Sequence, residues 1–154
     1  ACHEVLRLDA RFPMGHYVRG LALEQLDRVD EARSALEEAS AWSQSAEIVA
    51  ALAHVSGAAG DASRARELRG QLSTWSQERY VSPVLLAQVE LALGDAEAAM
   101  AQLDEAHRRH AADLIWLAVR PSFDPLRGDA RFGSLLTALG LPRVIPLPSS
   151  VPAR

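Results

Sequence analysis

Lysine is absent from this chain, cysteine occurs once, and aromatic residues make up only 5% of its 154 residues. The single cysteine, Cys2, excludes a disulfide within the chain, so no residue indicates an oxidising compartment and we expect a cytoplasmic setting. The first residues lack the basic start and apolar stretch of a signal peptide. No run approaches the roughly 18 apolar residues that a membrane span needs, so we expect no membrane partner.

Groups that would support catalysis or metal binding are also scarce. The chain has no Gly-x-Ser-x-Gly motif, and adjacent carboxylates such as Glu37 and Glu38 point away from each other on a helix. Asp104, His107 and His110 recur every three residues, but no fourth ligand follows, which favours a solvated helix face over a zinc site. The net charge of −4 disfavours binding to nucleic acid. We therefore expect no enzyme activity, no metal and no cofactor.

The feature that is present is a repeat. LAHVSGAAGDASRA, starting at Leu52, and LAQVELALGDAEAA, starting at Leu86, are displaced by 34 residues and agree at eight positions. Periods of this length are typical of stacked supersecondary units. Each unit is interpreted as two antiparallel helices separated by a Gly-Asp turn, because glycine ends a helix well and aspartate caps the next one.

An earlier, more diverged unit brings the number of repeats to three. We expect the helix pairs 13–27 with 29–43, 45–59 with 61–75, and 82–93 with 95–110, and a last helix between Asp129 and Gly140. The fold class is therefore all-α, a right-handed superhelical stack of antiparallel helix pairs with a C-terminal capping helix. The expected organisation is a helical domain over 1–141, with a partial repeat 1–12, repeats near 13–44, 45–78 and 79–112, and a capping segment 113–141, followed by a Pro-rich extended tail 142–154.

The three tryptophans and the tail have expected places in this stack. Trp42 and Trp75 recur at the same phase near the end of a second helix, which favours packing at the junction with the next repeat. Trp116 lies in an apolar run and is expected to cap the open end of the stack. The apolar segment Val144 to Pro148 is expected to pack on the last helices as a cap, with docking onto a neighbouring molecule as the alternative.

The spacing of small residues resembles that of the tetratricopeptide repeat over roughly residues 1–111. The positions that carry the resemblance are Gly20, Ala32, Ala39, Ala53, Ala65, Ala87, Ala99 and Ala106. The chain departs from the family at Arg69 and Leu72, where an aromatic and a small residue are usual. The resemblance implies an α-solenoid that binds a protein or peptide partner.

The segment Pro121 to Arg127, followed by Asp129 to Leu136, is similar to the ending of tetratricopeptide regions in bacterial multidomain regulators. This resemblance implies that the chain is the partner-binding or regulatory C-terminal part of a larger bacterial signalling or transcription-regulatory protein. The absence of an initiating methionine also favours a fragment.

In the register of that family, seven residues line the concave binding surface. They are Tyr17, Leu21, Glu24, Glu47, His54, Gln88 and Leu91. Together they predict a mixed, weakly acidic groove without the Lys, Arg and Asn residues by which co-chaperone domains grip a C-terminal carboxylate. The leading hypothesis is a protein-protein interaction scaffold. Its alternatives are a self-association module that forms a homodimer and, third, a small-molecule or metal sensor.

Overall fold

The computed structural model describes residues 9–142, so the start of the expected partial repeat and the segment Val144 to Pro148 lie outside the described residues. Within this range the chain forms seven α-helices and two short 3-10 helices, and no strand. In chain order they are α2 (Pro13–Gln25), α3 (Val29–Trp42), α4 (Ala46–Ala58), α5 (Ala62–Glu78), α6 (Pro83–Ala92), α7 (Ala96–Arg108), η1 (Ala112–Trp116), η2 (Pro121–Leu126) and α8 (Ala130–Ala138).

The expectation of an all-helical fold is confirmed for the described residues. Each of the six helices expected in the repeats begins and ends within three residues of its predicted bounds, and α8 lies between Asp129 and Gly140 as predicted. The right-handed superhelix and the repeat boundaries stay predictions. No helix of residues 9–142 combines the length and apolar character that crossing a bilayer requires.

The Gly-Asp turns have the backbone that the sequence predicts. Gly60 and Gly94 have φ angles of +81° and +79°, in the left-handed region that glycine adopts without a steric cost. Asp61 accepts a hydrogen bond from the Arg64 N–H at 3.0 Å, and Asp95 accepts one from the Ala98 N–H at 2.9 Å. Each aspartate thereby satisfies an N–H at the start of its helix that has no partner within the helix.

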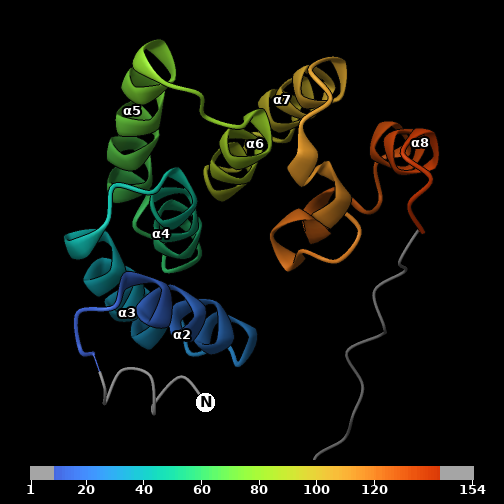
Figure 1. Cartoon of the computed structure of the whole chain (residues 1–154). Coiled ribbons are helices and arrows are strands. Elements are labelled where there is room, and N and C mark those ends of the chain that lie inside the picture. Colours follow the sequence, from blue (N-terminus) through green and yellow to red (C-terminus); the bar gives the residue numbers. More distant parts are fainter. Residues whose placement is uncertain (1–8, 143–154) are drawn as a thin grey trace, which may run out of the picture.

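The helices pack as three consecutive pairs, α2 with α3, α4 with α5, and α6 with α7. Successive pairs contact each other mainly through α4, which lies against both α3 and α6 (Figure 1). After α7 the chain leaves the paired pattern. It forms the two 3-10 helices, of which η2 returns against α6, and then α8, which contacts α7.

The core consists of two apolar clusters that meet at α6. Val81, Leu85 and Val89 belong to the cluster shared with α2 to α5, whereas Val84 and Ala87 belong to the cluster shared with α7, the 3-10 helices and α8. Because α6 is buried on both sides, it joins the two halves of the molecule. The residues with the small side chains expected at helix crossings are buried, namely Gly20, Ala32, Ala39, Ala53, Ala65, Ala87, Ala99 and Ala106.

Two glycines mark the closest approaches between helices. A Cβ atom added to Gly20 of α2 would lie 2.6 Å from Cγ of Leu36 in α3. One added to Gly57 of α4 would overlap the carbonyl oxygen of Ala92 in α6 and lie 2.9 Å from its Cβ. Gly57 therefore sets the distance between the second and third pairs.

The predictions for Trp42 and Trp116 are wrong. Trp42 is 50% exposed, and the Arg11 guanidinium lies over its ring, with Cζ 4.9 Å from the ring centroid. Trp116 is 51% exposed. Phe123 and Phe132 instead fill the C-terminal core, with both side chains fully buried and their rings stacked at 6.4 Å. Trp75 is half-buried against the first cluster, with the Arg79 guanidinium over its ring at 3.8 Å.

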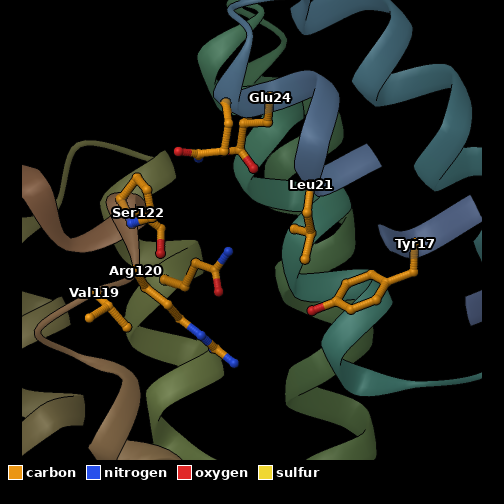
Figure 2. A pocket seen from close by; sticks show the side chains of 9 residues that line it. Tyr17, Leu21, Glu24, Val119, Arg120 and Ser122 are labelled. Carbon is orange, nitrogen blue, oxygen red and sulfur yellow. The ribbon is translucent and has the colours of Figure 1, made fainter. Parts of the chain in front are cut away.

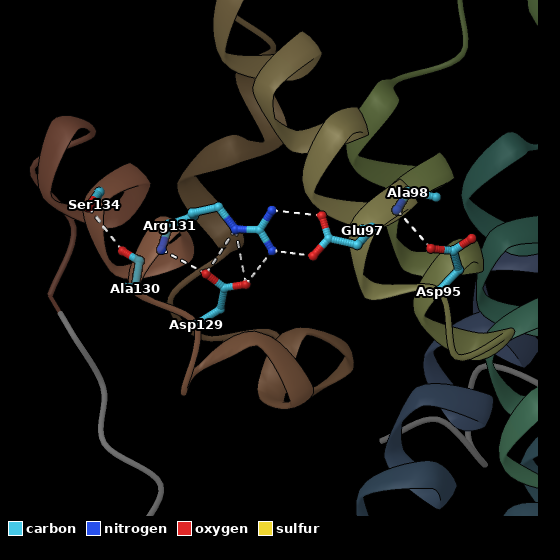
Figure 3. A network of polar contacts seen from close by, with 7 residues as sticks. All are labelled: Asp95, Glu97, Ala98, Asp129, Ala130, Arg131 and Ser134. Atoms are coloured by element: carbon cyan, nitrogen blue, oxygen red, sulfur yellow. Dashed lines mark hydrogen bonds and ion pairs between the residues drawn. The ribbon is translucent and has the colours of Figure 1, made fainter.

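An exposed network of ion pairs joins α8 to α7 (Figure 3). The Arg131 guanidinium donates two hydrogen bonds to Glu97, at 2.8 and 2.6 Å, and three to Asp129, at 2.7, 3.2 and 3.3 Å. Asp129 also accepts a hydrogen bond from the backbone N–H of Arg131 at 2.8 Å and so caps α8. The hydrogen bonds from Arg131 lower the pKa of both carboxyl groups.

We predict opposite effects of the same substitution at two helical glycines. Gly57→Ala should lower the free energy of unfolding by ~1–3 kcal/mol, because the added methyl group overlaps the backbone of α6. Gly70→Ala should raise it by ~0.5–1 kcal/mol, because Gly70 lies within α5 with no atom within 4 Å of its would-be Cβ. Thermal unfolding of both variants measures this. Equal shifts would contradict the close approach of α4 and α6.

We also predict that Arg131→Gln lowers the thermal midpoint at neutral pH and that this difference from wild type disappears in acid. The folded pKa values of Glu97 and Asp129 lie below the unfolded ones, so their stabilisation is present above about pH 5 and is lost as the pH falls through 4 and below. Melting curves from pH 7 to pH 3 measure the difference. Arg66→Gln is the matched control, since Arg66 is exposed on α5 with no ion-pair partner among the described residues. A difference that persists in acid would refute the network.

Candidate partner-binding cleft

A cleft of about 360 Å³ opens between α2 and the turn that precedes η2 (Figure 2). One wall comes from the first helix pair and the other from a segment about 100 residues further along the chain. The lining residues are Tyr17, Leu21, Glu24, Gln25, Gln88, Val119, Arg120, Pro121 and Ser122. Such a volume lies at the small end of the range for ligand pockets and fits one or two amino-acid residues of a partner.

The first wall of the cleft consists of side chains that share one face of α2. Tyr17, Leu21 and Glu24 are spaced by four and then three residues, so they share one face of α2. The adjoining flank of this helix is fixed on α3 through the contact of Gly20 with Leu36. Figure 2 shows the Leu21 side chain and the Tyr17 ring directed from α2 toward the gap.

The second wall is a tight turn held by its backbone. Arg120 precedes η2, its N–H donates to the Trp116 carbonyl at 3.0 Å, and its own carbonyl accepts from the Phe123 N–H at 3.2 Å. The buried ring of Phe123 anchors the turn in the C-terminal core. The Arg120 guanidinium points from this turn into the gap (Figure 2).

Two buried polar residues line the cleft. Gln88 of α6 is 7% exposed, and among the described residues its side-chain amide has no hydrogen-bond partner. Ser122 at the start of η2 is equally buried. An amide that can donate and accept in this position is available to a bound molecule, because burial strengthens a hydrogen bond that a ligand completes.

The cleft contains a paired carboxylate and a tyrosine whose pKa is shifted. The Glu24 carboxylate lies 3.1 Å from Nε2 of His54, and both side chains are less than one-fifth exposed. Nδ1 of His54 is buried and has no partner among the described residues. The pKa of Tyr17 is raised, mainly by burial and further by Glu47 and Glu24, while the positive charge of Arg120 opposes this rise. Tyr17 is therefore a neutral hydrogen-bond donor at neutral pH.

The structure brings together five of the seven residues predicted for the binding surface. Tyr17, Leu21, Glu24 and Gln88 line the cleft, and His54 contacts it through Glu24. The other two do not line the cleft, although the charge of Glu47 reaches Tyr17. Leu91 is half-buried against the C-terminal cluster. Glu47 is exposed, accepts a hydrogen bond from the Ser45 hydroxyl at 2.8 Å, and lines a second cavity of about 520 Å³ beside the loop that precedes α6.

The second wall, Val119 to Ser122, was not predicted from the sequence. In the sequence, Pro121 indicates that the chain turns after the apolar run. No local signal indicates that this turn lies opposite α2. Nor does the sequence indicate that His54 pairs with Glu24, because Glu24 lies 30 residues earlier in the chain.

The polar groups of the cleft define what a bound molecule would meet. Glu24 and His54 form a carboxylate-imidazole pair, but no serine, threonine or cysteine of residues 9–142 is hydrogen-bonded to that histidine. Nor does the described part of the chain contain three His, Cys, Asp or Glu side chains close enough to hold a metal ion. The cleft offers one guanidinium, one phenol, two side-chain amides, one carboxylate, one hydroxyl and an apolar wall.

Comparison with known proteins identifies no relative: no protein-family model, no curated protein and no solved structure matches the chain.

We predict that Arg120→Gln raises the pKa of Tyr17, because it removes the positive charge that favours the phenolate. The chain has two tyrosines, so the titration is followed by tyrosinate absorbance in a Tyr80→Phe background, in which Tyr17 is the only one. In both forms the stabilisation from the buried phenol is complete below about pH 10 and is lost as the pH rises through the folded pKa. Arg66→Gln should leave the titration unchanged. An unchanged pKa in Arg120→Gln would place Arg120 away from Tyr17.

Proposed function

We propose that this chain is a peptide-binding module that recruits a protein partner, built as an α-solenoid of the tetratricopeptide type. The observation that carries the proposal is the cleft itself. Its lining combines an apolar wall, a buried amide and a half-buried cation, which is the composition of a recognition site for a peptide. Four residues that the family register assigns to the binding surface line this cleft, which supports the tetratricopeptide assignment.

The biological setting that we propose follows from the same resemblance. The module is the partner-binding or regulatory end of a bacterial signalling or transcription-regulatory protein in the cytoplasm, and its ligand positions an attached output domain. Repeat stacks suit this role because they present a rigid, extended surface without contributing catalytic groups.

Self-association is the second candidate, and exposed apolar side chains favour it. Phe12, Met14 and Val18 at the start of α2 are between 41% and 50% exposed, and Ile115 on η1 is 61% exposed. Exposed apolar side chains that gather on one surface are frequent at protein interfaces. The molecular mass in solution, measured by light scattering, distinguishes a monomer from a dimer.

The proposed function predicts that filling the cleft abolishes peptide binding. A random peptide library is displayed and selected on the whole chain, and the enriched peptides are measured against Val119→Trp. Val119 lines the cleft and is 60% exposed, so a larger ring there blocks the site without disturbing the core. We expect at least a tenfold loss of affinity, since blocking the site removes several kcal/mol of contacts.

Glu37→Trp is the matched control for this experiment, because Glu37 is exposed on α3 and does not line the cleft. Enriched peptides should bind this variant as they bind wild type. If they bind Val119→Trp equally well, the site lies elsewhere and the proposal is wrong.

A further inference from the structure

We propose that Arg120 recognises a carboxylate on the bound peptide, and that the residue next to this carboxylate is apolar and packs against Leu21 and Val119. This inference rests on the proposed peptide-binding function and adds the chemistry of the ligand. The recognised group is either the C-terminal carboxylate of the partner or an acidic side chain within it.

The first argument is that the Arg120 guanidinium is left without a partner. Although it is half-buried and directed into the cleft, it makes no hydrogen bond or ion pair with another residue of the described range 9–142. Nearby arginines differ. The side chain of Arg127 is hydrogen-bonded to the Ala118 carbonyl at 3.1 Å, and Arg131 is paired with Glu97 and Asp129. A partly desolvated guanidinium with unused donors gains more from an anion than an exposed one does.

The second argument is that the carboxylates closest to this site have other partners. Glu24 is paired with His54, and Glu47 accepts its hydrogen bond from Ser45. Neither carboxylate forms an ion pair with Arg120. A carboxylate brought by a ligand therefore does not have to displace either of them. The Tyr17 hydroxyl and the Gln88 amide supply neutral donors on the same cleft.

The third argument concerns the charge of the ligand. A single guanidinium matches one carboxylate through two parallel hydrogen bonds. A dianionic phosphate would face Glu24 and Glu47 with only one cation to balance it, and this repulsion disfavours it. The side chains of Leu21, Val119 and Pro121 then account for the apolar neighbour of the carboxylate.

The test uses three capped tripeptides as probes, measured by NMR titration of the whole chain. The first ends in leucine with a free carboxylate, the second is the same peptide amidated, and the third is amidated with an aspartate after its leucine. Binding of the first probe indicates a C-terminal carboxylate, and binding of the third indicates an acidic side chain; we expect one or both to bind. The second probe, which has no carboxylate, should bind at least tenfold more weakly. Arg120→Gln should weaken the binding at least tenfold, and added salt should weaken binding to wild type.

Arg66→Gln removes the same charge from the exposed face of α5 and should bind the probes as wild type does. Unchanged melting curves show that Arg120→Gln folds. The inference is overturned if wild type binds the amidated leucine peptide as tightly as the carboxylate probes. It is also overturned if Arg120→Gln binds any carboxylate probe as tightly as wild type does. If selected peptides are blocked by Val119→Trp but unaffected by Arg120→Gln, the peptide-binding function stands and carboxylate recognition fails. If they are unaffected by both variants, both proposals fail.

Discussion

The close approach of helices at glycine and alanine positions is the constraint on which the structure depends. At Gly57, the backbone of α4 comes so near to Ala92 that no side chain fits between them. Small residues at these crossings let leucine and valine side chains from neighbouring turns interdigitate, so apolar surface is buried with few aromatic residues. The same contact positions α6 relative to α4. It therefore also positions Gln88 relative to the cleft wall on α2, because α4 packs on the first pair through α3.

Helix α6 has a second constraint, a buried carboxylate. Glu90 is only 6% exposed, and burial raises the pKa of its carboxyl group, while the Arg69 guanidinium at 2.9 Å opposes this rise. The pair joins α5 to α6 and so crosses from the second helix pair to the third. Only the Glu90 side of this ion pair is buried, so the pair adds little net stability. Loss of Arg69 would leave a buried charge or an unsatisfied acid, which penalises any other register between the helix pairs. Close packing at Gly57 and this ion pair therefore favour the same arrangement.

The sequence predicted what is encoded within one repeat. Gly60 with Asp61 and Gly94 with Asp95 determine where helices end and begin through bonds between near neighbours, so both turns could be assigned before the structure was known. Trp42 shows where such reasoning stops. Its phase matches that of Trp75, yet Trp42 is half-exposed beneath Arg11, because burial depends on which segment lies beside it and not on its position within the repeat.

The two walls of the cleft also differ in whether the sequence predicts them. Its repeat-derived wall follows from helical periodicity and could be predicted, whereas its only arginine comes from a turn that has no counterpart in the repeats. Because Arg120 lies on a short turn anchored by Phe123, its side chain is not part of either apolar cluster. A substitution at this position therefore changes the charge of the cleft while the helix crossings keep their packing. Under the proposed function, the paired helices position the ligand and the segment after them determines which charge it carries.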